Sequence, residues 1–174
     1  MPQSFLPGFI LFALLAAPQP LAHSQDTYAW QDLAGTWRGE GLLRAAPEAD
    51  LEQGVCRFDI EASSDNTLTL SGRCATAAQT GQVSTQINRS DNGTITGSAT
   101  SPLVAAPVAL SGTQSGGTLA LSSTAPVEME GQSYTVSSQI DGWLGDGVFT
   151  LIQRLAQPDT APVVVMQMRF TRSP

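Results

Sequence analysis

The sequence predicts an all-β protein in which roughly eight to ten strands follow one another as an antiparallel meander. Apolar and polar residues alternate with a period of two along most of the chain, and turn-forming residues cluster roughly every 8 to 14 residues. No segment keeps the 3.6-residue period of a helix. Closing such a meander removes exposed strand edges, so we expect a closed or nearly closed barrel, with a β-sandwich as the alternative.

The first 24 residues are typical of a signal peptide. An apolar run ends at residues 11–17 (LFALLAA), too short to span a bilayer, and Ala22 and Ser24 are small residues at positions −3 and −1 of a cleavage site. The alternative is a buried N-terminal helix. We therefore expect residues 25–174 to form a single all-β domain that is exported to the periplasm or the cell exterior and has no transmembrane segment.

The first strand is expected at residues 36–43, and a disulfide-linked hairpin follows an acidic loop at 48–52. Alternation in residues 56–62 and 68–74, with a turn centred on Asp65, sets the register of the hairpin. The predicted cross-strand pairs are Ala62 with Leu68, Ile60 with Leu70, Phe58 with Gly72, and Cys56 with Cys74. Phe58 covers the bare backbone at Gly72 in this register, and Arg57 faces Arg73, an unfavourable pair of like charges.

Cys56 and Cys74 are the only cysteines, and an oxidising compartment allows them to pair. The alternative is a redox-active dithiol, which needs a closer spacing of the CxxC kind and an electropositive setting. We therefore expect a structural disulfide, contributing about 3 kcal/mol in the chain-entropy model.

The remaining strands follow from the same alternation. A three-residue turn at 91–93 aligns Ile87 with Gly97 and Thr85 with Ala99. Val108 and Leu110 are expected to pair with Leu119 and Leu121 across a loop that contains Gly116 and Gly117. Further strands are expected at 134–140, 149–154 and 163–172, the last with Val164, Met166, Met168 and Phe170 on one face.

Small residues line one face of the early strands, so the interior is either hollow or filled from elsewhere. A hollow interior would hold an apolar ligand, whereas the alternative is an ordinary packed core with methionine filling gaps. The candidate lining of a ligand pocket comprises the large apolar side chains nearest this face: Trp37, Phe58, Trp143, Met166, Met168 and Phe170.

Composition excludes several kinds of chemistry. All eight basic residues are arginine, so lysine-based catalysis is excluded, and the single histidine, His23, falls in the predicted signal peptide. The remaining chain thus has neither a nucleophile–histidine pair nor a histidine metal ligand. A formal net charge of −7 disfavours nucleic acid. We expect no catalytic residues, no metal site and no cofactor.

Residues 33–37 (LAGTW) resemble the G-x-W start of the calycin superfamily, which includes lipocalins and fatty-acid-binding proteins. This resemblance implies a calycin-like barrel whose Trp37 closes one end and is covered by an arginine from late in the chain, either Arg169 or Arg172. Residues 37–41 (WRGEG), 56–58 (CRF) and 73–75 (RCA) together resemble an uncharacterised family of small exported proteobacterial β-barrel proteins. That resemblance implies a compartment and a fold but no activity.

Two kinds of function follow from these observations. The first is a non-enzymatic exported barrel that binds an apolar small molecule or an envelope partner. The second is a protease inhibitor that acts through residues 25–30, because LAGTW also resembles the start of periplasmic inhibitors of bacterial metalloproteases. Those inhibitors are one-disulfide barrels whose N-terminal arm plugs the protease, and the residues around the two cysteines here differ from theirs.

Overall fold

The computed structural model describes residues 30–44, 46–101, 104–129, 131–142 and 147–174, so the predicted signal peptide lies outside the described residues. Within them, no helix is long and apolar enough to cross a membrane. The described elements are a short 3-10 helix and eleven strands: η1 (Trp30–Leu33), β1 (Gly35–Leu43), β2 (Glu52–Ser64), β3 (Thr67–Thr76), β4 (Thr80–Arg89), β5 (Thr94–Thr100), β6 (Val108–Ser115), β7 (Thr118–Ser123), β8 (Val127–Met129), β9 (Gln132–Asp141), β10 (Val148–Ala156) and β11 (Val163–Arg172).

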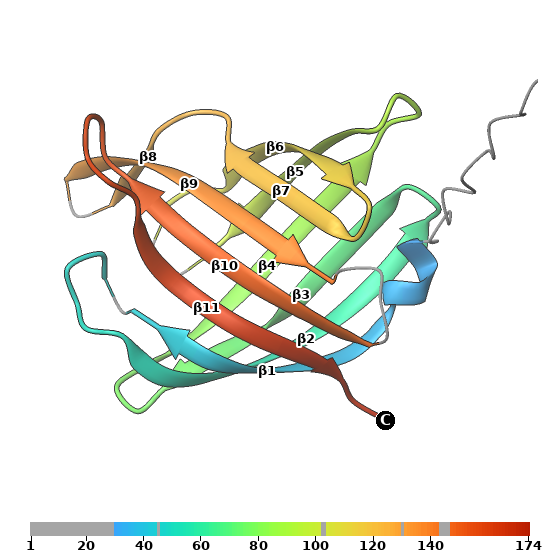
Figure 1. Cartoon of the computed structure of the whole chain (residues 1–174), viewed down its shortest axis with the longest axis horizontal. Helices are drawn as coiled ribbons and strands as arrows, with labels where there is room; N and C mark the ends of the chain where they lie inside the picture. Colours follow the sequence, from blue (N-terminus) through green and yellow to red (C-terminus); the bar gives the residue numbers. More distant parts are fainter. Residues whose placement is uncertain (1–29, 45, 102–103, 130, 143–146) are drawn as a thin grey trace, which may run out of the picture.

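The strands form one closed antiparallel barrel (Figure 1). From β1 to β7 each strand pairs with the next along the chain, β9 pairs with both β7 and β10, and β11 joins β10 to β1. Ten strands therefore make a complete ring, and β8 adds to β9 beside the stretch that pairs with β7. The predicted all-β, calycin-like barrel is confirmed, and the sandwich alternative is wrong because the first and last strands are hydrogen-bonded to each other.

Alternation along each strand decides which side chains enter the barrel. In β2, Cys56, Phe58 and Ile60 are buried, while Arg57 and Asp59 between them are exposed. Successive side chains of a strand point to opposite faces, so burying one set leaves the other in water. The gain from removing apolar surface from water fixes the choice of face.

The register of the β2–β3 hairpin is confirmed. Ala62, Ile60, Phe58 and Cys56 lie opposite Leu68, Leu70, Gly72 and Cys74, and the two cysteines form a disulfide with a Cα–Cα distance of 4.1 Å. A Cβ atom placed on Gly72 would lie 2.3 Å from Cδ1 of Phe58, so the ring does cover this glycine. Arg57 lies opposite Arg73, also as predicted.

The β4–β5 hairpin is confirmed, whereas the β6–β7 register needs correction. Ile87 and Thr85 lie opposite Gly97 and Ala99, and Gly93 takes the positive φ of 82° that its turn requires. In β6 and β7, Leu110 lies opposite Ser123 and Gly112 opposite Leu121. The turn uses only Gly116 and Gly117, so the strands run to Ser115 and Thr118 and each pairing moves by an even number of residues. The buried faces are preserved because the shift is even.

A β-bulge changes the predicted face of β11 near its start. Gln153 of β10 lies opposite Met166, but Arg154 lies opposite Val164, which leaves Val165 without a partner in the ladder. The extra residue turns Val165 into the core, where it is 8% exposed, and the prediction that Val164 shares the face of Met168 and Phe170 is wrong. The period-two pattern of a sequence does not show where a bulge inserts an extra residue into a strand.

Candidate ligand-binding cavity

One end of the barrel is closed by η1 and two tryptophans. Figure 1 shows η1 beside the turn that joins β2 to β3. Trp30 is 0% exposed and its Nε1 donates to Oε1 of Gln114 at 3.0 Å. Trp37 is 2% exposed and its Nε1 donates to the carbonyl oxygen of Leu33 at 2.9 Å. Both indole N–H groups are therefore satisfied, as buried polar groups require.

Two arginines cover these tryptophans. The guanidinium carbon of Arg89 lies 4.9 Å from the centroid of the Trp30 ring, and that of Arg172 lies 5.0 Å from the centroid of the Trp37 ring. Arg172 also donates from Nη2 to the carbonyl oxygen of Asp32 in η1. Of the two arginines named for this position, Arg172 occupies it, while Arg169 lies opposite Glu40 on the outside of the barrel.

An aromatic cluster fills the space behind the closed end. The ring centroids of Trp37 and Phe149 are 4.9 Å apart, those of Phe149 and Phe170 are 4.8 Å apart, and those of Phe170 and Phe58 are 5.1 Å apart. Met168 is 2% exposed in the same core. This part of the interior has the dense packing expected of an ordinary core.

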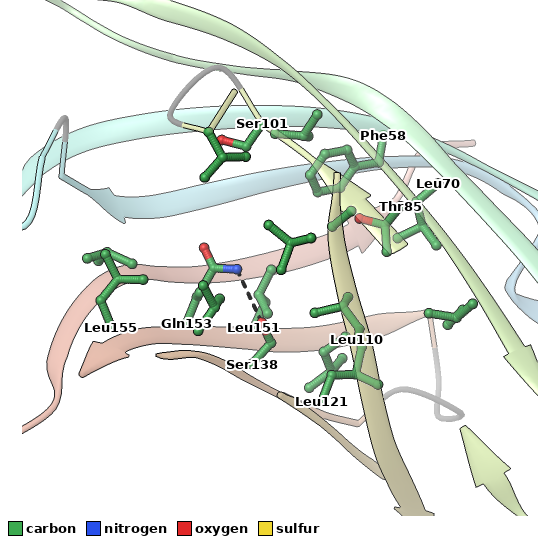
Figure 2. Close-up of a pocket in the computed structure, with 18 of the residues that line it drawn as sticks. Phe58, Leu70, Thr85, Ser101, Leu110, Leu121, Ser138, Leu151, Gln153 and Leu155 are labelled. Atoms are coloured by element: carbon green, nitrogen blue, oxygen red, sulfur yellow. Dashed lines mark hydrogen bonds between the residues drawn. The ribbon is translucent and has the colours of Figure 1, made fainter. Parts of the chain in front are cut away.

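The interior also contains two adjoining spaces of about 160 Å³ and 210 Å³, which we call the inner and outer spaces. The side chains that line both form the junction between them: Phe58, Val83, Thr85, Ala99, Ser101, Leu151, Gln153 and Val165. Figure 2 shows these walls, with Leu110 and Leu121 on one side and Phe58 and Leu70 on another.

The inner space is lined mainly by aliphatic side chains from β4 to β10. Its polar lining groups within the described residues are Thr85, Ser101, Ser138 and Gln153, and none of its lining side chains is ionisable. Nε2 of Gln153 donates to Oγ of Ser138 at 3.2 Å, the dashed line in Figure 2. A few placed polar groups in an apolar concavity are characteristic of small-molecule sites.

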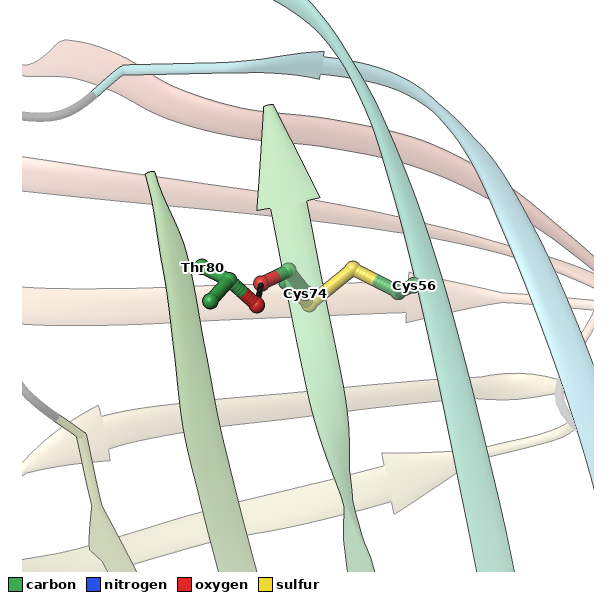
Figure 3. The surroundings of a disulfide bond; sticks show 3 residues. All are labelled: Cys56, Cys74 and Thr80. Atoms are coloured by element: carbon green, nitrogen blue, oxygen red, sulfur yellow. Dashed lines mark hydrogen bonds between the residues drawn. A yellow bond between two sulfur atoms is a disulfide. The ribbon is translucent and has the colours of Figure 1, made fainter. Parts of the chain in front are cut away.

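The outer space lies toward the opposite end of the barrel from η1 and has a more polar rim. Arg44 lines it, with Nε donating to the carbonyl oxygen of Val164 at 2.8 Å and Nη1 to that of Ala49 at 2.7 Å. Cys74 lines it too, and Oγ1 of Thr80 donates to the carbonyl oxygen of Cys74 at 3.2 Å (Figure 3). The disulfide thus ties β2 to β3 beside this rim.

The residues predicted to line a pocket fall into three groups. Phe58 lines both spaces, and Met166 lines the outer one. Trp37, Met168 and Phe170 belong to the packed closed end and are not among the lining side chains. Trp143 lies outside the described residues.

Several lining residues were not singled out from the sequence. Ser138 and Gln153 are polar residues at inward positions of β9 and β10, and Thr85 occupies such a position in β4. A polar side chain at an inward position of an otherwise apolar face is the signal that marks them. The inhibitor hypothesis places Trp30 at the end of an N-terminal arm, whereas in the structure it is buried beneath Arg89.

The described residues bring together no group of three or more His, Cys, Asp or Glu side chains able to hold a metal ion. No protein-family model matches the sequence. No curated protein matches it either.

Proposed function

We propose that the protein is an exported, non-enzymatic barrel that binds an apolar small molecule in the hollow part of its interior. The observation that carries this proposal is the contrast between the two halves of the barrel. Trp37, Phe149 and Phe170 fill one half, whereas aliphatic side chains surround adjoining spaces of about 160 Å³ and 210 Å³ in the other.

The apolar walls support an occupant. Most side chains that line the inner space are aliphatic, and Leu70, Val83 and Leu151 among them are only partly buried. Removing apolar surface from water contributes about 25 cal/mol per Å². An apolar ligand that covers these walls gains this energy and adds contacts along them.

The lining supports binding rather than catalysis. Arg44 and the disulfide-bonded Cys74 are the only lining residues of ionisable type in the two spaces, among the described residues. General acid–base and nucleophilic catalysis both need a titratable group within reach of the reacting atoms. Export is part of the proposal because disulfides persist in oxidising compartments.

Buried Trp30 favours this function over protease inhibition. Its ring is 0% exposed, hydrogen-bonded to Gln114 and covered by Arg89. A side chain held in this way is part of the closed end of the barrel and does not extend from it. Residues 25–29 of the arm lie outside the described residues.

The test is ligand binding to the intact protein and to a variant with a filled cavity. Ala99 lines both spaces, and the neighbouring Ser98 is exposed on the outside of the same strand. The neutral fluorophore N-phenyl-1-naphthylamine should bind the wild type and Ser98→Phe, and should lose most of its binding in Ala99→Phe. Native mass spectrometry after detergent-free purification should show a co-purifying small molecule. Absence of fluorophore binding to the folded wild type would refute the proposal.

A further inference from the structure

We propose that the outside of the barrel carries a separate binding site, a groove over β2, β3 and β4 that binds a small sugar phosphate. The groove has a volume of about 480 Å³. Two rows of side chains line it, which are Arg57, Arg73 and Gln82 in one row and Asp59, Ser71 and Ser84 in the next. This inference goes beyond the proposed function, because these side chains lie on the exposed face of the sheet and are polar or charged.

Two arginines lie directly opposite each other in this groove. Arg57 of β2 and Arg73 of β3 are cross-strand partners, and both side chains are exposed. Directly opposed residues have Cβ atoms about 4.5–5.5 Å apart, and like charges at that spacing destabilise a sheet. Arg38 is paired with Glu40 at 3.1 Å, whereas neither groove arginine makes an ion pair or a hydrogen bond with another described residue. The groove therefore presents two positive charges that no carboxylate of the described chain neutralises.

The disulfide holds the two arginines in this arrangement. Cys56 and Cys74 form the neighbouring pair of the same ladder, and their Cα atoms are 4.1 Å apart. A covalent bond at this position fixes the register, so Arg57 stays opposite Arg73 despite their repulsion. A site that is arranged before its ligand arrives loses less conformational freedom on binding. An anion that binds both guanidinium groups also relieves their repulsion.

A phosphate group matches this pair of arginines. Each guanidinium can donate two parallel N–H groups to phosphate oxygens, and such charge-assisted hydrogen bonds are strong. A phosphate monoester carries a charge of about −1.5 to −2 at pH 7 and has three strong acceptor oxygens, so one group neutralises both Arg57 and Arg73. A carboxylate has one charge and two oxygens, which suit a single arginine. Gln82, the partner of Arg73 in β4, adds an amide donor to the same row.

The next row supplies partners for the hydroxyl groups of a sugar. Asp59 lies opposite Ser71, and Ser71 lies opposite Ser84, two residues along each strand from the arginine row. That separation is about 7 Å. Oδ1 of Asp59 accepts from Oγ1 of Thr36 at 2.7 Å, which leaves Oδ2 to accept from a ligand hydroxyl. The hydroxyls of Ser71 and Ser84 make no hydrogen bond with another described residue, and each can donate or accept. A carboxylate repels a second anionic group, so this row favours an uncharged, hydroxylated part of the ligand.

The net charge of the chain favours a small ligand over a polyanion. The formal charge is −7, so a nucleic acid or an anionic membrane would bring many negative charges against an acidic molecule. Interactions between exposed charges are largely screened beyond about 8 Å at physiological ionic strength. A monosaccharide phosphate in the groove is therefore attracted by Arg57 and Arg73, while distant carboxylates repel it only weakly.

The experiment titrates glucose 6-phosphate into the full chain and follows backbone amide shifts by NMR, which detects weak binding at an exposed site. We expect the shifts to concentrate in β2, β3 and β4, with a dissociation constant on the order of 1 mM or below. Inorganic phosphate and glucose, which each present only one part of the ligand, should bind at least about 5-fold more weakly. Raising the ionic strength should weaken glucose 6-phosphate.

Variants assign the two parts of the ligand to the two rows. Arg57→Gln and Arg73→Gln should each weaken glucose 6-phosphate by at least about 5-fold, and neither should lower the melting temperature, because each removes a repulsion. The Ser71→Ala/Ser84→Ala variant should weaken glucose 6-phosphate and leave inorganic phosphate unchanged. Arg169→Gln makes the same change of charge on β11, outside the groove, and should alter the affinity by less than about twofold.

Each part of the inference has its own contrary result. Inorganic phosphate that binds as tightly as glucose 6-phosphate would overturn the role of the sugar. Equal weakening by Arg169→Gln and Arg57→Gln would reduce the effect to general charge and overturn the placement in the groove. No shifts with glucose 6-phosphate at about tenfold the expected constant would refute the site. Ala99→Phe should bind glucose 6-phosphate as the wild type does, so this result is independent of the interior spaces.

Discussion

The guanidinium carbon of Arg172, near the end of β11, lies 5.0 Å from the ring centroid of Trp37 in β1. The two residues are also direct partners in the β1–β11 ladder, which closes the barrel. The same arginine donates to the carbonyl oxygen of Asp32 in η1. One side chain thus contacts the first strand, the last strand and the helix that covers the closed end.

Replacing Arg172 should therefore weaken the closed end. Arg172→Ala removes a cation–π contact and a hydrogen bond, and we expect it to lower the free energy of unfolding by about 1–2 kcal/mol in urea denaturation. Arg169→Ala on the exposed face of β11 is the control, with an effect within about 0.5 kcal/mol. Equal effects of the two variants would contradict a specific role for Arg172.

Removing the disulfide should destabilise the barrel through the unfolded state. The bond between Cys56 and Cys74 closes a loop with a sequence separation of 18, so the Cys56→Ser/Cys74→Ser variant should lose about 3 kcal/mol. Urea unfolding under identical conditions measures the difference. Addition of a reductant to the denatured wild type should reproduce the loss, and wild-type stability that does not respond to reduction would contradict the bond's role.

A side chain at Gly72 should destabilise the β2–β3 hairpin. A Cβ atom at this position would lie 2.3 Å from Cδ1 of Phe58 and 2.1 Å from the carbonyl oxygen of Arg57. We expect Gly72→Ala to cost about 1–3 kcal/mol because the hairpin must shift to admit the methyl group. Gly117→Ala, where a Cβ atom meets nothing within 4 Å, is the matched control. Similar melting temperatures for the two variants would show that the Phe58 ring can move aside without loss of stability.

Truncating Trp30 should strongly destabilise the closed end. Trp30→Ala empties a fully buried site, and we expect a loss of about 3–5 kcal/mol. Gln114→Ala removes only the acceptor of the indole N–H and should cost about 1–2 kcal/mol. If Trp30→Ala left stability unchanged, Trp30 would be free to engage a partner, as the inhibitor hypothesis requires.

Local patterns were sufficient to predict the barrel and the β2–β3 and β4–β5 hairpins. In the β2–β3 hairpin, the turn at Asp65 and the period-two alternation act within about twenty residues of each other, and together they admit one register that pairs Cys56 with Cys74. The β6–β7 register was wrong because the length of the Gly116–Gly117 turn was not evident from composition. The bulge at Val165 likewise could not be predicted from the alternation of apolar and polar residues.

The cavity could be predicted only as an alternative to a filled core. Whether space remains depends on the summed volumes of inward side chains from ten strands, and these lie far apart in the sequence. Phe58 was a sound candidate because it sits midway along β2, between the packed aromatic cluster and the hollow. Trp37, Met168 and Phe170 were indistinguishable from it in sequence, since apolar character alone does not say toward which end a residue lies.

The hydrogen-bonded seam between β1 and β11 has a consequence for biogenesis. A ribosome makes β1 long before β11, so a growing chain presents two bare strand edges until its final segment emerges, and such edges invite association with other chains. Ring closure must then wait for synthesis to finish, and contacts between such distant segments form slowly. A chain that closes in this way is exposed to misassembly until its last strand is made, so a chaperone that covers the open edges should assist its folding.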